Sequence, residues 1–228
     1  MRSILPLNSK VKKCRSARAT LARKYLSGHG IEIGALARPV PVPHAEVRYY
    51  DRLDEPELGA LYPHQAEWLV PLDGICDIET LQSIEVGSLD FVVACKVIEY
   101  TSNVLAAFHA MRRVLKPGGI AFLSISDMRQ TMDRHRPVTT LGQIAADYVH
   151  GPATDHFEQW LPFIEDGAGD DAAQRIELVV QHTQRTRQHV WTPTAWMELL
   201  TEVQRGLGFE LCTWHVTQRE ILTVLRKC

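Results

Sequence analysis

The chain has 228 residues, enough for one α/β domain with a substantial core. Its 25 basic and 27 acidic residues give a net charge of -2, which gives no reason to expect nucleic acid or a membrane surface as a partner. Five cysteines without a CxxC pair indicate reduced thiols, not a disulfide framework or a zinc site, so no metal is expected. No apolar leader and no stretch near the roughly 20 apolar residues of a membrane span are present, so we expect a cytoplasmic protein.

The N-terminal segment, residues 1–27, is predicted to contain an amphipathic helix over residues 9–26 that lies against the domain formed by residues 28–228. Its apolar residues recur at helical spacing: Val11, Cys14, Ala17, Leu21 and Tyr25.

Short apolar runs predict the first three strands over residues 30–34, 46–51 and 66–72. Three prolines follow the first of these runs, and they exclude a long helix there: Pro39, Pro41 and Pro43.

The middle of the chain reads as a strand, a helix and a second strand. Residues 88–95 are almost continuously apolar, as in a central parallel strand that is buried on both faces. Thr101 or Ser102 is expected to cap a helix that ends at the LKPGG turn, and residues 120–126 form the next strand. This order predicts a right-handed crossover in an open parallel sheet.

Residues 127–192 interrupt this alternation and are interpreted as a mostly helical insertion. A helix is then expected from Thr192 or Thr194 to Gly206 or Gly208, followed by the antiparallel strands FELCTWHV and REILTVLR. The predicted fold class is α/β, with a Rossmann-like, open, mostly parallel sheet, an antiparallel C-terminal strand and a helical insertion.

The residues that follow the predicted strands are mostly acidic. Ligands of open α/β sheets bind at the carboxyl ends of the strands, where this chain places Glu32, Asp51, Asp73, Asp77 and Glu99. Carboxylates accept hydrogen bonds from a ribose diol and compensate an ammonium or sulfonium charge, whereas phosphate cofactors prefer glycine-rich helix N-termini. S-adenosylmethionine (SAM) combines these cationic groups with a ribose.

Five segments in order strengthen this interpretation: GIEIGALARPVPVP, VRYYDRL, LDGICDIETL, GSLDFVVACKVIEY and RRVLKPGGIAFLSISD. Their order resembles the class I SAM-dependent methyltransferases, and more closely a bacterial group often associated with polysaccharide and glycosyltransferase clusters. The resemblance covers residues 28–127, and residues 192–227 fit the closing elements of the same fold. It implies SAM as cofactor and a small-molecule or glycan acceptor that the insertion helps to enclose.

The resemblance also implies roles for the residues after the first two strands. Glu32 and Gly34, with Ala35 beside them, belong to the first motif, in which the glycine lets the backbone approach the methionine part of the cofactor. Asp51, followed by Arg52, would accept hydrogen bonds from both ribose hydroxyls.

Further along the chain, Asp77 would bind the adenine amino group, with Ile78 packed on the ring. The methionine end would be lined by Ala94, Cys95 and Lys96. Lys96 and Glu99 are the candidates for orienting the acceptor, and no catalytic base is identified.

Two alternatives remain open. The first alternative is a non-catalytic protein of the same fold, with a regulatory or scaffolding role. Two features support it: only Gly34 precedes the prolines, and Lys96 and Tyr100 replace histidines expected in the closer group. A nicotinamide-dependent oxidoreductase is disfavoured because no GxGxxG follows the first strand. The acceptor and the oligomeric state are not determined by the sequence.

Overall fold

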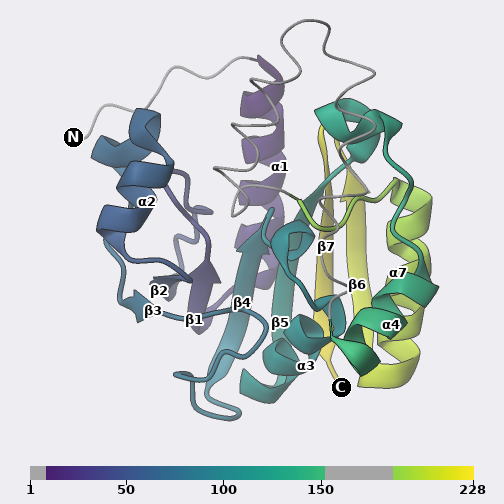
Figure 1. Cartoon of the computed structure of the whole chain (residues 1–228). Helices are drawn as coiled ribbons and strands as arrows, with labels where there is room; N and C mark the ends of the chain where they lie inside the picture. The colour runs from purple at the N-terminus through teal and green to yellow at the C-terminus, as the bar shows by residue number, and fades with distance from the viewer. Residues whose placement is uncertain (1–8, 152–186) are drawn as a thin grey trace, which may run out of the picture.

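A computed structural model describes residues 9–151 and 187–228. Its centre is a sheet with the strand order β3-β2-β1-β4-β5-β7-β6 (Figure 1). Neighbours are parallel from β3 to β5, and β7 is antiparallel to both β5 and β6. The strands are β1 (Gly28–Ile33), β2 (Ala45–Asp51), β3 (Gly74–Ile75), β4 (Leu89–Cys95), β5 (Leu115–Ser126), β6 (Phe209–Val216) and β7 (Glu220–Lys227). The predicted fold class is confirmed.

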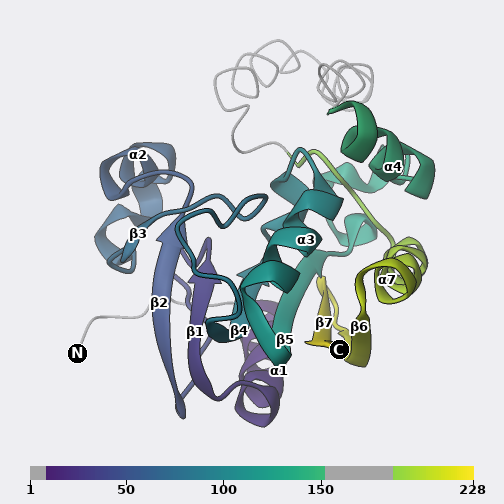
Figure 2. The same cartoon turned by 90° about the horizontal axis from the view of Figure 1, so that it is seen from below.

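Helices cover both faces of this sheet. Seen along the sheet, α1 lies on one face, whereas α3 and α7 lie on the other (Figure 2). The α-helices are α1 (Ser9–Tyr25), α2 (Glu55–Leu61), α3 (Val104–Val114), α4 (Leu141–His150) and α7 (Pro193–Leu207). The 3-10 helices are η1 (Pro63–Trp68), η2 (Ile98–Tyr100), η3 (Met128–Gln130) and η4 (Met132–His135).

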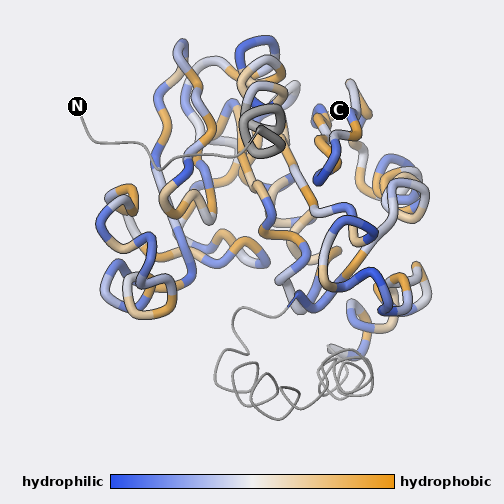
Figure 3. Tube along the Cα trace, turned by 90° about the horizontal axis from the view of Figure 1, so that it is seen from above, coloured by the Kyte–Doolittle hydropathy of each residue, from blue (hydrophilic) through white to orange (hydrophobic). Residues whose placement is uncertain are grey.

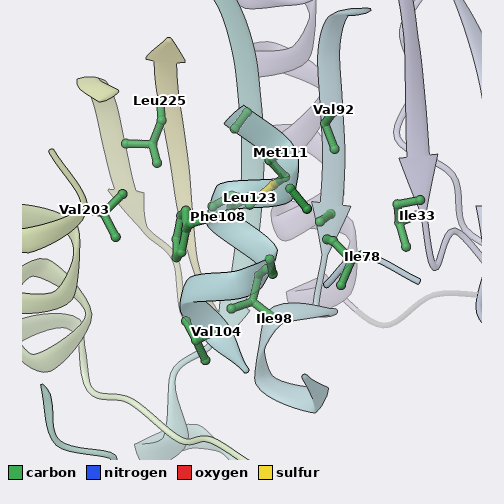
Figure 4. Close-up of a cluster of buried hydrophobic side chains, with 14 of the residues drawn as sticks. Ile33, Ile78, Val92, Ile98, Val104, Phe108, Met111, Leu123, Val203 and Leu225 are labelled. Carbon is green, nitrogen blue, oxygen red and sulfur yellow. The ribbon is translucent and has the colours of Figure 1, made fainter. Parts of the chain in front are cut away.

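The larger apolar core lies between the sheet and the α3/α7 face. Helix α3 buries a stripe at helical spacing, formed by Val104, Ala107, Phe108 and Met111 (Figure 4). Hydrophobic residues accordingly follow the central strands and the inner sides of the helices (Figure 3).

The cap of α3 differs from the prediction. Asn103, not Thr101 or Ser102, accepts a hydrogen bond from the N–H of Ala106. The Thr101 hydroxyl donates instead to the carbonyl of Ile98, which closes the preceding η2 turn. The predicted helix therefore begins one or two residues later than expected.

The opposite face carries a smaller apolar cluster. Ala22 and Leu26 pack there with Phe91, Phe122 and Val224. No helix follows β1: residues 34–44 form turns and extended chain. Val40 of this segment packs into the same cluster. The proline-rich stretch therefore behaves as predicted.

The predicted strand over residues 66–72 is wrong. Residues 63–68 form η1, and the strand that pairs with β2 is only the two-residue β3. Pro63 starts the 3-10 turn, and Pro71 has no N–H for a strand ladder. The backbone on either side of Pro71 bonds to other segments: the N–H of Val70 donates to the carbonyl of Leu36, and the N–H of Leu72 donates to the carboxylate of Glu55.

The C-terminal elements agree with the prediction. Thr192 caps α7 by accepting from the N–H of Ala195, and Gly208 ends the helix at φ 61°. The antiparallel pair β6 and β7 closes the sheet, while β5 begins at Leu115, opposite Leu89, earlier than the predicted 120.

Of the predicted insertion, η3, η4 and α4 are helical, and residues 152–186 lie outside the described residues. No helix in the described ranges has the length and apolar character to cross a membrane.

Candidate functional site

A cavity of about 410 Å³ opens at the carboxyl ends of the parallel strands. It lies where the strand order reverses between β1 and β4, the usual ligand position in such sheets. Nine of the residues predicted for the cofactor line it: Glu32, Gly34, Ala35, Asp51, Arg52, Asp77, Ile78, Cys95 and Lys96. Ala94 does not line it, because its side chain is fully buried in the larger apolar core.

Glu32 is a buried carboxylate at the end of β1. Both of its oxygens accept from the N–H of Val40, at 3.2 and 2.9 Å, so the side chain holds the proline-rich loop against the sheet. Burial raises the pKa of Glu32 to about 8, partly opposed by this hydrogen bond and by Arg18. A cation bound in the cavity would favour the charged form.

Gly34 is required by both its conformation and its surroundings. Its φ is +70°, and a Cβ there would lie 2.7 Å from Cγ2 of Val97. The loops after β1 and β4 therefore touch at this glycine, beside the cavity.

Asp51 follows the second strand as predicted. Its Oδ1 accepts from the N–H of Arg52 at 2.8 Å, and its carbonyl accepts from the N–H of Cys76, which begins the loop after β3. Burial raises the pKa of the Asp51 carboxyl above its ordinary value. The carboxylate thus has a fixed orientation in a half-enclosed position.

Asp77 lies on the same side of the cavity. Its Oδ1 accepts from the N–H of Glu79 at 2.8 Å, while its carbonyl accepts from the N–H of Leu81 at 2.7 Å. Ile78 is buried beside it. Glu79, which the sequence analysis did not select, also lines the cavity, and burial raises its pKa. This end of the cavity is therefore acidic.

Cys95 and Lys96 follow β4. Burial raises the pKa of the Cys95 thiol to about 12, so it is neutral and not a nucleophile. Lys96 has a left-handed backbone, φ 60°, fixed by a 2.6 Å hydrogen bond from its N–H to Ser124. Burial against the cavity wall lowers the pKa of the Lys96 ammonium, and the negative charge of Glu220 opposes this effect.

Glu99 does not share the cavity with Lys96. It is buried, accepts from the N–H of Ser126 at 3.0 Å, and forms a 3.5 Å ion pair with Arg187. The structure thus places Lys96, but not Glu99, where an acceptor could reach it.

Sequence reasoning missed two charged residues that meet beneath the cavity. Arg18 of α1 and Glu220 of β7 form a buried ion pair, and both line the cavity. A signal was present: Arg18 precedes the buried Ala22 by one helical turn, and Glu220 lies on the same strand face as the buried Leu222 and Val224. Among the described residues, no cluster of histidine, cysteine and carboxylate side chains could hold a metal ion.

Residues 64–123 match the methyltransferase domain family. A ubiquinone biosynthesis O-methyltransferase from Xanthomonas campestris pv. campestris (strain B100) is 26% identical over 141 residues, which cover 61% of this chain and 56% of that protein. The chain therefore matches little more than half the length of this curated relative.

Two solved structures have a similar fold. The PH0226 protein of Pyrococcus horikoshii OT3 aligns with a TM-score of 0.56 at 19% identity, covering 97% of this chain and 92% of that one. The N-methyltransferase NodS of Bradyrhizobium japonicum WM9, crystallised with S-adenosyl-l-homocysteine (SAH), aligns with a TM-score of 0.53 at 16% identity, covering 98% and 90%. At these identities the comparison shows a shared fold.

Proposed function

We propose that this chain, which has the class I methyltransferase fold and a segment that matches the methyltransferase domain family, is a SAM-dependent methyltransferase that acts on a small acceptor in the cytoplasm. One observation carries the proposal: the carboxylates of Glu32, Asp51 and Asp77 follow three parallel strands and line one cavity at the reversal of strand order.

The residues fit the chemistry of this cofactor. Asp51 would accept from the ribose hydroxyls, and Asp77 would accept from the adenine amine with Ile78 against the ring. Glu32 is buried without a full counter-charge, as its raised pKa indicates, and the ammonium of the methionine part would supply one. When bound, SAM supplies an electrophilic methyl group, and the protein's task is to hold the acceptor in line with it and exclude water.

For the acceptor we propose only a chemical class. The relative above is named an O-methyltransferase and the structural neighbour an N-methyltransferase, which supports an oxygen or nitrogen atom of a small molecule. A carbohydrate-linked acceptor, enclosed in part by residues 127–192, stays a prediction from the resemblance.

Calorimetric titration with SAM and SAH tests the cofactor. We expect saturable binding of both, and an affinity about tenfold lower in Asp77→Asn, because the amide forms a weaker hydrogen bond to the adenine amine than the charged carboxylate does. Asp73→Asn is the matched control: its carboxylate accepts from the N–H of Tyr49 at 2.7 Å and does not line the cavity.

Failure of both ligands to bind the wild-type protein would overturn the proposal. Equal affinities of wild type and Asp77→Asn would remove Asp77 from the adenine site. An inosine analogue of SAH that binds as well as SAH would have the same consequence.

A non-catalytic protein of the same fold is the second candidate. It is favoured by the loop after β1, which is tied to the sheet through Val40 and Glu32 in place of a glycine-rich turn and helix. Binding of SAM, with no methyl transfer from labelled SAM to any acceptor in a bacterial metabolite extract, would favour this candidate.

A further inference from the structure

The two ends of the cavity differ in charge. Near β1, β2 and β3 the lining has four carboxylates and two arginines, whereas near β4, β7 and α1 it has three cations and one carboxylate. The first set is Glu32, Asp51, Asp77 and Glu79 with Arg38 and Arg52, and the second is Arg18, Lys96 and Arg219 with Glu220.

Glu220, the carboxylate at the cationic end, is bonded to Arg18 and Ser124. Arg18 Nε donates to Oε1 of Glu220 at 3.0 Å, and Nη2 donates to Oε2 of Glu220 and to the Ser124 hydroxyl. The Ser124 hydroxyl, which accepts from Arg18, donates its own proton to Oε2 of Glu220 at 3.0 Å. Glu220 is therefore neutralised locally, and Arg18 Nη1 makes no hydrogen bond to any described residue.

Lys96 and Arg219 flank the end of β5. Lys96 donates its N–H to the carbonyl of Ser124, and Arg219 accepts at its carbonyl from the N–H of Asp127, at 3.2 Å. Within residues 9–151 and 187–228, neither side chain forms an ion pair. The neighbouring carboxylates have other partners, since Asp127 pairs with Arg129 and Glu99 pairs with Arg187.

We infer that the acceptor carries an oxyanion, a carboxylate or a phosphate, which Lys96 and Arg219 bind at the cationic end of the cavity. The inference rests on the proposed function, because it assigns the acidic end to the cofactor. Two exposed cations that line the cavity and form no ion pair among the described residues repel a sulfonium at close range and attract an anion. An anionic acceptor would therefore be drawn to this end and oriented there, since both cations are donors of charge-assisted hydrogen bonds.

The test is a titration of the ¹⁵N-labelled, SAH-saturated protein, followed by amide chemical shifts. The probes share an aromatic ring and differ in charge: benzoate, phenyl phosphate and benzyl alcohol. We expect saturable shifts around Lys96 and Arg219 with the two anions and none with the alcohol. The tighter anion identifies a carboxylate or a phosphate as the group recognised.

Variants assign the binding to these cations. Lys96→Met and Arg219→Gln should each weaken the anion about fivefold while SAH affinity is retained. Arg23→Gln, an exposed change on α1 outside the cavity, is the control and should leave both affinities unchanged.

Two results would overturn the inference: anion affinities that are equal in wild type and both variants, or a larger loss of SAH affinity than of anion affinity, which would assign these cations to the cofactor's carboxylate. If SAH fails to bind, the proposed function fails, and the same titration of the ligand-free protein still decides whether the anion site exists.

Discussion

The two faces of the sheet differ in what they bury. Against α3 and α7 the sheet is mostly apolar, and aromatic rings such as Phe108 and Trp196 fill the space, with centroids 6.3 Å apart. Against α1 the apolar cluster stops short of the carboxyl ends of the strands. There the inward positions are Glu32, Cys95, Ser124 and Glu220.

This contrast follows from strand alternation. In β5, Phe122 and Ser124 point to the same face, so the α1 face changes from apolar to polar within two residues. One face thus provides most of the hydrophobic stabilisation, and the other provides the charged groups that line the cavity. Mutations on the α3/α7 face should therefore change stability without changing ligand binding.

Trp196→Ala should give the largest effect. The side chain is fully buried, and its Nε1 donates to the hydroxyl of Thr223 at 2.8 Å. Loss of the ring and of this donor should lower the free energy of unfolding by about 5 kcal/mol, measured by urea denaturation. Trp196→Phe keeps most of the packing and should cost clearly less. A large fall in SAH affinity of the folded variant would contradict the separation of the two faces.

Glu220→Leu should have the next largest effect, because it leaves the Arg18 guanidinium buried without its carboxylate. We expect a loss of about 3 kcal/mol in unfolding free energy. The double variant Arg18→Met, Glu220→Leu removes both charges and should recover most of that loss. A double variant no more stable than Glu220→Leu would show that the penalty arises from shape and not from the unpaired charge.

Asp51→Ala should affect binding with little change in stability. SAH affinity should fall about tenfold in calorimetry, because charge-assisted hydrogen bonds to the ribose are lost. Asp54→Ala is the matched control on the same loop: Asp54 caps α2 by accepting from the N–H of Glu57 and does not line the cavity. That variant should lose about 1 kcal/mol of stability and keep its SAH affinity.

Glu32→Gln should give an effect that is visible only as a dependence of stability on pH. The folded protein raises the pKa of Glu32 from 4.5 to about 8, so the neutral form favours folding. This contribution is fully present below pH 4.5 and is lost as the pH rises to about 8. The unfolding free energy of Glu32→Gln relative to wild type should therefore increase over this interval. A constant difference would show that Glu32 is ionised throughout.

Much of the fold follows from local patterns. The apolar run of β4, the stripe of α3 and the LKPGG turn specify a crossover unit without knowledge of distant residues. Asp51 was predictable because it ends a strand of the parallel sheet, and Asp77 lies two residues after β3 although the strand predicted before it was wrong. The short β3 was not, because an apolar run interrupted by Pro71 resembles a strand until its hydrogen bonds to Leu36 and Glu55 are known.

The buried ion pair could not be predicted because it depends on docking. Helical spacing shows that Arg18 shares a face with Ala22, and strand alternation shows that Glu220 faces inward. Neither pattern specifies that the two residues meet, since the helix could lie on either face of the sheet. In this contact Glu220 is bonded to Arg18 and Ser124 and forms no ion pair with Lys96, although its charge still acts on the pKa of Lys96.

The pairing of Arg18 with Glu220 joins residues 202 positions apart, and β7 inserts between β5 and β6. During synthesis on the ribosome, α1 therefore emerges before β7, and Arg18 has no ionic partner until the residues between them have been made. Until then β5 presents an unpaired edge and the apolar side of α1 is without this anchor, a combination that favours aggregation of incomplete chains. We expect the domain to reach its native state only after its last strand has left the exit tunnel.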